Sequence, residues 1–599
     1  MPSLEFKGKS FIYTHHLSVP FRELVVDAKK SLPAKGEKPS LDDNLIIHGD
    51  NLHALKALLP VYAGKIDCIF IDPPYNTGNE GWCYNDNVRS PLMKEWLKKE
   101  ANPVDKEDLE RHDKWLCMMW PRLQLLKDLL AEDGSIWITL DDNEGFRAKV
   151  LCDEVFGEDN CVGTIVWQHS VQPKGYKGKF SVHHNYVLVY SRSDLFTLGD
   201  LERTDEHNVN YSNPDNDPRG AWRSGDVRNA LNRDRLKYDI ITPSGKRIKP
   251  PEKGWRWSES TLQSKIKTGE IVFSEDETRI IRKIYLETVD GRTPETIWFA
   301  KDVGTTREAA EEQKDILGSV VIETAKPVRL VECIMSLTGR DDSIFLDSFA
   351  GSGTTAHAVL AANKKDGGNR KFILVETEDY AHTLTAERVR RVIKGYAFEG
   401  TQREELHREP ITWTKLKKAK DLIEKVEGIQ MMAERKFDRV KAAVEDGELV
   451  VTGEKDVKQK TEGLGGSFTF ATLGPEMSIE ALLADGLPAF DALAKYVYYT
   501  ATGRTLAEVP RQTEKSCGYI GETESHRVHL LYTPDKAWLK SDKAALTEQA
   551  VDEIVATNRT GKKTLVFAAA KFMGQRDLTK RGVDFCQLPY AIHRILGDT

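Results

Sequence analysis

One stretch decides the fold of this chain: Ile69-Phe70-Ile71-Asp72-Pro73-Pro74-Tyr75-Asn76-Thr77-Gly78. It begins in the mostly apolar run 66–71, which predicts a buried strand. The strand must end at the two prolines, because neither has an N–H to donate to a neighbouring strand. Ligands of open α/β sheets bind just beyond the carboxyl ends of the strands. The stretch therefore places a carboxylate, a rigid turn and an aromatic ring where a flat, amine-bearing base can be held.

Length and composition indicate a multidomain protein. At 599 residues the chain exceeds what one core accommodates, so we expect about three or four domains. No run of about 18 uncharged apolar residues predicts a membrane span, and the first residues carry no secretory signal. The eight cysteines form no CxxC pair, so we predict neither a metal site nor a disulfide framework. These features favour a location in the reducing cytoplasm.

Expected strands and helices alternate on both sides of a central interruption. Such alternation is typical of a largely parallel sheet. The expected strands are 45–48, 66–71, 135–140, 162–167, 186–190, 343–346 and 371–375, and the expected helices are 52–59, 115–130, 146–156, 328–335 and 356–363.

The interruption has a different composition. Turn-forming residues crowd into 213–220, and tryptophans then interleave with basic residues. The net charge of −7 argues mildly against nucleic-acid binding, but local basic patches decide that question. Arginine and tryptophan side chains suit phosphate contact, base-edge readout and stacking, although tryptophans are more often core residues. The candidate nucleic-acid contacts are Arg219, Trp222, Arg223, Arg256 and Trp257.

A second motif combines glycines with two acids. The loop 347–355 lies between an expected strand and an expected helix, and Glu376 ends the next strand. Glycines allow close backbone approach to a ligand, and an acid at that place accepts hydrogen bonds from a ribose. A phosphate loop needs a lysine, which is absent here, and Asp347 and Glu376 would repel a triphosphate. The acids suit a cationic or zwitterionic nucleoside cofactor such as S-adenosylmethionine; a plain strand–turn–helix glycine is the alternative.

These motifs together resemble the N6-adenine DNA methyltransferases in which the catalytic motif precedes the cofactor loop. More narrowly, they resemble the modification subunits of type III restriction-modification systems. The resemblance covers 42–192 and 322–395. Its motifs are Gly49–Leu52, Asp72–Gly78, His112–Leu130, Asp141–Glu144, His184–Tyr186, Lys326-Pro327 and Asp347–Thr355.

The resemblance implies an α/β fold: a Rossmann-like methyltransferase sheet in permuted motif order, an inserted target recognition domain and a smaller C-terminal α/β domain. It also implies double-stranded DNA as substrate, a homodimer and a helicase-nuclease restriction subunit as partner. The expected parts are an N-terminal arm (1–41), a catalytic part (42–192), the insert (193–321), a cofactor part (322–400), a charged helical arm (401–462) and the C-terminal domain (463–599).

The expected chemistry assigns roles to both motifs. Asp72 and the Pro73 carbonyl accept the two N–H bonds of the target amine, Pro74 keeps the turn rigid, and Tyr75 stacks on the base. The cofactor side comprises Asp50, Asn76, Thr77, Lys326, Asp347, Phe349, Gly351, Ser352, Gly353, Thr354 and Glu376. Asp50 serves equally well as a helix N-cap, Pro327 as an ordinary helix start, and Asn76 and Thr77 as turn-stabilising residues. N4-cytosine methylation and a catalytically silent DNA-recognition subunit are the alternatives.

Overall fold

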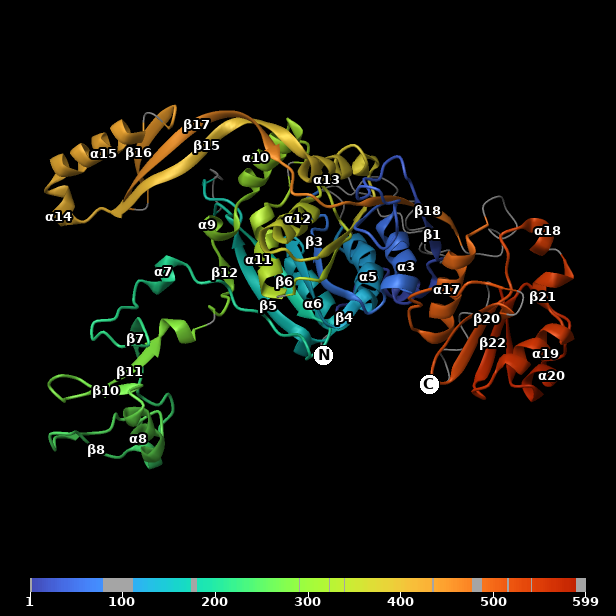
Figure 1. The fold of residues 1–599 in the computed structure, drawn as a ribbon, viewed down its shortest axis with the longest axis horizontal. Helices are drawn as coiled ribbons and strands as arrows, with labels where there is room; N and C mark the ends of the chain where they lie inside the picture. The colour runs from blue at the N-terminus through green and yellow to red at the C-terminus, as the bar shows by residue number, and fades with distance from the viewer. Residues whose placement is uncertain are drawn as a thin grey trace. The chain divides into compact units, whose positions relative to one another are not determined.

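The computed structural model describes 3–78, 111–173, 180–289, 291–322, 324–338, 340–433, 436–445, 447–476, 487–513, 516–539 and 541–588. The chain divides into two compact units (Figure 1). One unit contains Met1–Thr197 and Thr296–Thr599, and the other is the insert, Leu198–Glu295.

The first unit is built on a ten-stranded mixed sheet. All contacts from β18 to β4 are parallel, whereas β1, β6 and β5 introduce antiparallel pairs. The strands in sheet order are β1 (Arg22–Val26), β18 (Thr469–Glu476), β2 (Leu45–His48), β14 (Lys371–Glu376), β13 (Ile344–Asp347), β3 (Ile66–Ile71), β4 (Leu130–Leu140), β6 (His184–Ser191), β5 (Cys161–Gln168) and β12 (Ile297–Trp298). The predicted α/β fold class is confirmed.

The order of the strands explains why two distant motifs meet. β13 comes late in the chain but lies between β14 and β3. Its register pairs Phe345 with Cys68 and Leu346 with Ile69, so the carboxyl ends of β3 and β13 are neighbours. From this point the chain proceeds to β14 on one side and to β4 on the other. Such a switch point is where open α/β sheets bind ligands.

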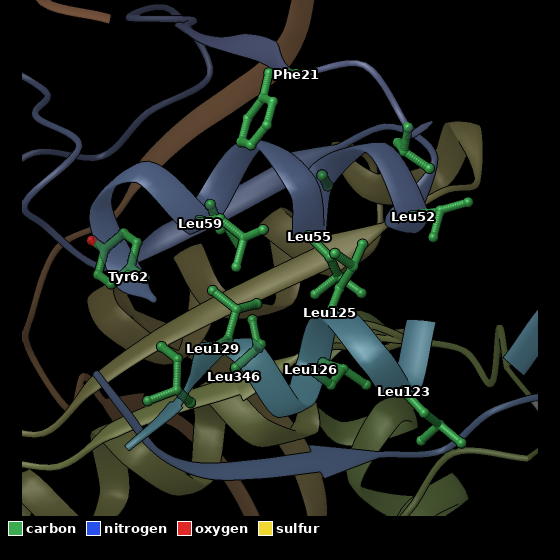
Figure 2. Close-up of a cluster of buried hydrophobic side chains, with 14 of the residues drawn as sticks. Phe21, Leu52, Leu55, Leu59, Tyr62, Leu123, Leu125, Leu126, Leu129 and Leu346 are labelled. Atoms are coloured by element: carbon green, nitrogen blue, oxygen red, sulfur yellow. The ribbon is translucent and has the colours of Figure 1, made fainter. Parts of the chain in front are cut away.

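Helices bury the apolar faces of this sheet. Leucines of α3 and α5 face each other and Leu346 of β13, as Figure 2 shows. Fully burying each such side chain contributes about 1.5–3 kcal/mol. The helices of this part are α1 (Lys9–Ile12), α2 (His15–Ser18), α3 (Asn51–Tyr62), α5 (Arg111–Leu129), α6 (Gly145–Phe156), α9 (Ala300–Val303), α10 (Thr306–Leu317), α11 (Val328–Thr338), α12 (Thr354–Asp366) and α13 (Thr385–Lys394).

The insert has a small core of its own, formed by Ile240, Trp255, Leu262, Ile271 and Ile280. Its elements are α7 (Asp205–Asn208), β7 (Trp222–Gly225), β8 (Ile240–Ile241), β9 (Arg247–Ile248), α8 (Glu259–Lys267), β10 (Ile271–Phe273) and β11 (Ile280–Tyr285).

The insert is narrower than the predicted range 193–321. The last strand of the predicted range, β12, lies outside the insert and pairs with β5 of the main sheet. The reason is side-chain packing, because Trp298 stacks on Trp137 of β4 with ring centroids 6.2 Å apart. The following helix α10 also belongs to the first unit. The composition of the sequence changes less sharply than the fold at this boundary.

The prediction of a helical arm over 401–462 is wrong. Three strands, β15 (Gly395–Pro410), β17 (Glu448–Glu462) and β16 (Arg439–Glu445), form an antiparallel sheet, and β15 and β17 appear as one long curved ribbon in Figure 1. Of the residues described in this range, only α14 (Trp413–Leu416) and α15 (Ala419–Ala433) are helical. Glu445 pairs with Glu448, and Gly447 has a φ of 83°, so the antiparallel pairing of β16 with β17 overrides the helix propensity of the charged residues.

The C-terminal part contains a four-stranded sheet with helices. Its elements are α17 (Phe490–Thr502), β19 (Tyr519–Glu522), β20 (His526–Leu530), α18 (Lys536–Leu539), β21 (Ala545–Leu546), α19 (Glu548–Thr557), β22 (Lys563–Ala568), β23 (Ala570–Lys571), α20 (Gln575–Lys580) and β24 (Val583–Gln587).

Two boundaries near the chain ends differ from the expectation. Residues 469–471, which we assigned to the C-terminal domain, are in β18, which pairs with β2 of the main sheet. The residues that we expected to form an N-terminal arm include β1, the edge strand beside β18. Within the C-terminal domain, 477–486 lie outside the described residues, and α17 begins at Phe490.

Within the described part of the chain, no helix is long and apolar enough to cross a membrane. The same residues contain no group of histidine, cysteine and acidic side chains that could hold a metal ion.

Candidate active site

Asp72 directly follows β3, and both of its carboxylate oxygens have partners. Thr139 Oγ1 of β4 donates a hydrogen bond of 2.6 Å to Asp72 Oδ1. Lys326 Nζ donates to Asp72 Oδ2 and forms an ion pair with it. The side chain of Lys326 is only 4% exposed, so the pair is shielded from water. These contacts fix the orientation of the carboxylate and leave its remaining lone pairs available as acceptors.

The turn after Asp72 is held in place by a residue of α5. The buried Trp115 donates its indole N–H to the Pro74 carbonyl at 2.7 Å. Tyr75 lies half-buried with Lys326 Nζ 5.0 Å from its ring centroid. Burial and the nearby Asp72 charge raise the pKa of Tyr75 well above its usual value, so its hydroxyl stays neutral. Pro73 is buried between these residues.

Asn76 has the left-handed conformation, with φ 60°, and is fully buried. Its side-chain amide donates to the Arg111 carbonyl at 3.1 Å and to Glu144 Oε1 at 2.5 Å. These contacts favour the turn-stabilising alternative over a cofactor contact for Asn76. Thr77 follows it and is half-buried.

The glycine loop begins at Asp347, the last residue of β13. Asp347 accepts hydrogen bonds from Thr355 Oγ1 at 2.6 Å and from the Phe349 N–H at 3.0 Å. Burial raises the pKa of this carboxyl to about 7, and the charges of Asp72 and Glu376 act in the same direction. The charges of Asp72, after β3, and Asp347, at the end of β13, therefore repel each other.

The loop itself curves around the end of β14. Gly351 and Gly353 have φ values of 50° and 81°, which residues with a Cβ rarely adopt. Glu376 accepts the Gly351 N–H at 2.7 Å and the Glu378 N–H at 3.0 Å. The carboxylate of Glu376 thus holds the backbone of the loop at Gly351. Phe349 of the same loop is half-buried.

Arg388 supports this loop and was not predicted as a site residue. It is fully buried on α13 and donates to Ser352 Oγ at 2.8 Å and to Thr354 Oγ1 at 3.0 Å. Its charge is balanced by Glu312 of α10, at 3.4 Å. The sequence signal for this role is weak, because Arg388 stands among other charged residues of a strongly amphipathic helix.

Asp50 acts as the N-cap of α3, since it accepts the His53 N–H at 3.2 Å. Its other oxygen lies 3.7 Å from the buried Arg122. The next residue, Asn51, donates to the Ser348 carbonyl at 3.0 Å and so joins α3 to the start of the glycine loop. The N-cap alternative explains the observed contacts of Asp50.

The predicted nucleic-acid contacts of the insert separate into two groups. Arg219 is bound internally to Asp217, and Trp222 donates its indole N–H to Asp215 at 2.8 Å. Their contacts hold the insert together.

The other three side chains remain accessible: Arg223 and Arg256 are exposed, and Trp257 is half-buried beneath Arg282, whose guanidinium lies 5.6 Å from its ring centroid.

A groove of about 1190 Å³ is present in the insert. Five cationic side chains and two acidic ones line it. The cations are Arg228, Arg233, Arg235, Lys253 and Arg256, and the acids are Asp226 and Glu252. Arg228 is paired with Asp226 at 2.9 Å, whereas Arg233 and Arg235 are exposed. The groove therefore has the charge that attracts a polyanion.

Comparison with known proteins gives the class of this molecule. Residues 66–387, more than half of the chain, match the DNA methylase family, and the chain belongs to that family.

Its relatives include two type III modification subunits. The Mod subunit of the StyLTI restriction-modification enzyme from Salmonella typhimurium is 32% identical over 386 residues, covering 62% of this chain and 57% of the relative. The EcoPI Mod subunit of Escherichia phage P1 is 32% identical, covering 63% of this chain and 64% of the relative. The type II methyltransferase M.KpnI of Klebsiella pneumoniae is also 32% identical, covering 56% of this chain and 80% of that protein. The matches thus span less than two thirds of the length of both Mod subunits.

Replacing Lys326 tests how the site orients Asp72. Lys326→Met removes the charge that holds Asp72 Oδ2, so the carboxylate keeps the hydrogen bond from Thr139 but its orientation is less restricted. We expect kcat/KM for methyl transfer to DNA to fall about 100-fold, the scale of a 1 Å misplacement. The measurement is incorporation of labelled methyl groups into DNA. Lys365→Met, an exposed change on α12, is the control and leaves the rate unchanged; an equally unchanged rate for Lys326→Met contradicts the assignment.

Proposed function

We propose that the protein is a site-specific DNA methyltransferase that transfers a methyl group from S-adenosylmethionine to the N6 amine of an adenine in duplex DNA. One observation carries the proposal. Asp72, with both oxygens held in place, stands beside the glycine loop at the point where the sheet order switches. A fixed hydrogen-bond acceptor is thereby next to a nucleoside-type cofactor loop, which is the pairing that amine methylation requires.

The residues of the loop fit S-adenosylmethionine. Asp72, Asp347 and Glu376 end the three neighbouring strands β3, β13 and β14, a setting that favours a cationic or zwitterionic ligand. Among the described residues, the buried Ser348 Oγ has no hydrogen-bond partner and is available to a ligand. Glu376 accepts two N–H bonds and retains lone pairs for ribose hydroxyls. When bound, the cofactor supplies an electrophilic methyl group.

The catalytic turn would prepare the amine. The N6 lone pair of adenine is delocalised into the ring, so the amine is a poor nucleophile. Asp72 and the Pro73 carbonyl would accept its two N–H bonds and direct the lone pair toward the methyl carbon. The ion pair with Lys326 orients the Asp72 carboxylate as a hydrogen-bond acceptor for the amine. Alignment, rather than strong base catalysis, is the main contribution of the site.

The base must leave the duplex before it reaches this turn. Flipping costs a few kcal/mol. Stacking on the Tyr75 ring returns about 1–3 kcal/mol. The pairing of Asp72 with Pro73 in this motif order favours adenine over cytosine, whose N4 amine would use a similar site. A silent recognition subunit would not need both a held Asp72 and a formed glycine loop.

The insert would select the DNA site. Its basic groove supports contact with phosphates, and the exposed Arg223 and Arg256 support contact with base edges. Two of the relatives at 32% identity are named Mod subunits of type III restriction-modification enzymes, so we further propose a modification role with a restriction subunit as partner. The motif resemblance to that class also leads us to propose a homodimeric state.

Removal of the Asp72 carboxylate tests the catalytic role. Asp72→Ala takes away the acceptor that faces the amine, and we expect methyl transfer to fall by at least about 100-fold. Binding of S-adenosylmethionine, followed by calorimetry, should survive, since the glycine loop is untouched. Asp133→Ala serves as the control, since Asp133 is exposed in the first part of β4 and pairs with Arg340, away from the carboxyl end of the strand. Equal methylation by Asp72→Ala and the wild type would refute the role.

Neutralising the groove tests the DNA-binding role of the insert. The double variant Arg233→Ala/Arg235→Ala removes two exposed charges. We expect weaker binding to duplex DNA and a salt dependence, log K against log[salt], that is shallower by about 0.9 for each phosphate that the protein no longer neutralises. Fluorescence anisotropy at several salt concentrations provides the measurement. Arg307→Ala, exposed on α10 outside the insert, should change neither quantity. An unaltered slope in the double variant would exclude the groove as a phosphate-binding surface.

A further inference from the structure

Glu144 is a fully buried carboxylate that has no role in the chemistry assigned to the catalytic turn and the glycine loop. It lies between the end of β4 and the start of α6, with 0% of its surface exposed. It occupies the N-cap position of α6, yet its side chain makes no capping hydrogen bond. A buried charge is costly unless it has partners, and here the partners belong to other segments.

The partners of Glu144 join it to the catalytic turn. Asn76 Nδ2 and His112 Nδ1 each lie 2.5 Å from Glu144 Oε1. Asn76 also donates to the Arg111 carbonyl, so the turn, the start of α5 and the start of α6 meet at this oxygen. Asn76 needs such support, because its φ of 60° is uncommon for a residue other than glycine.

The charges around Glu144 are mixed. Arg147 of α6 lies 3.9 Å from Glu144 Oε2, and Arg111 of α5 also favours the ionised carboxylate, whereas Asp141 at the end of β4 opposes it. Burial raises the pKa of Glu144 to about 7 and lowers the pKa of His112 to about 4. His112 is therefore a neutral imidazole near pH 7, and Glu144 is joined to Asn76 and His112 by hydrogen bonds rather than by a full ion pair.

We propose that Glu144 is a positioning residue for methyl transfer: through Asn76 it holds the turn that presents Asp72, Pro73 and Tyr75 to the target base. This inference rests on the proposed methyltransferase function. Glu144 touches neither Asp72 nor the glycine loop, and it acts only through the backbone of the turn. Its loss therefore affects the rate of transfer and not the binding of the cofactor.

A double-mutant cycle tests whether Glu144 acts through Asn76. The four proteins are the wild type, Glu144→Ala, Asn76→Ala and the double variant. We expect each single change to lower kcat about 100-fold, and the double variant to be no slower than the slower single variant, because both changes release the same turn. Rates are divided by the number of cofactor-binding sites found by calorimetry, so unfolded protein does not count. Glu144→Gln, whose carbonyl still accepts the Asn76 N–H, should recover the rate to within about tenfold of the wild type.

Glu154 provides the matched control, since it lies on the same helix, α6, but pairs with Lys9 of α1. The effect of Glu154→Ala should be independent of Asn76→Ala. A double variant of Glu144 and Asn76 that is slowed by the product of the single effects would overturn the inference, as would full activity of Glu144→Ala.

Denaturant midpoints of the same four proteins give a readout without methylation. Non-additive shifts support the contact between Glu144 and Asn76, and additive shifts contradict it. A wild-type protein that methylates no DNA would refute the proposed function and with it the catalytic part of this inference, while the midpoints would still report on the contact.

Discussion

The ion pair between Lys326 and Asp72 is the contact on which the candidate site depends. Its partners are 254 residues apart in the chain, with the whole insert between them. They meet because β13 lies beside β3 in the sheet, and because the glycine loop after β13 binds the Lys326 backbone, whose carbonyl accepts a hydrogen bond of 3.1 Å from Thr354 Oγ1. The parallel register of these two strands brings the catalytic turn and the glycine loop to the same edge. Other residues of the site hold one of these two segments in place. Trp115 binds the turn, and Arg388 binds the glycine loop.

The organisation of the chain follows from this constraint. Because the motif order is permuted, the insert lies in the sequence between the two segments that form the sheet. After the insert, the chain continues in the first unit with β12 and α10. Glu312 of α10 then pairs with Arg388, which supports the glycine loop. The segment that follows the insert is thus in contact with the cofactor side of the sheet.

Local patterns predicted much of this arrangement. The end of β3 at Asp72, the glycine loop after β13 and the alternation of strands and helices are all visible in short windows of sequence, because prolines, glycines and apolar runs act locally. The partners of Asp72 and Asn76 were beyond such reasoning. Thr139 and Arg388 are ordinary polar residues in the sequence, and Glu144 stood only at the end of the segment Asp141–Glu144 with no role assigned to it. The tertiary fold buries all three against the motifs. The three-stranded sheet over 395–462 was missed for a related reason, since its charged residues favour a helix locally while the pairing of β15 with β17 joins residues far apart.

The most direct test of the account is the identity of the methylated base. Duplex DNA is incubated with the purified protein and S-adenosylmethionine labelled in its methyl group, digested to nucleosides and analysed by mass spectrometry. The account predicts that the label is found in N6-methyladenine. Label in N4-methylcytosine alone, or DNA without label, would contradict it.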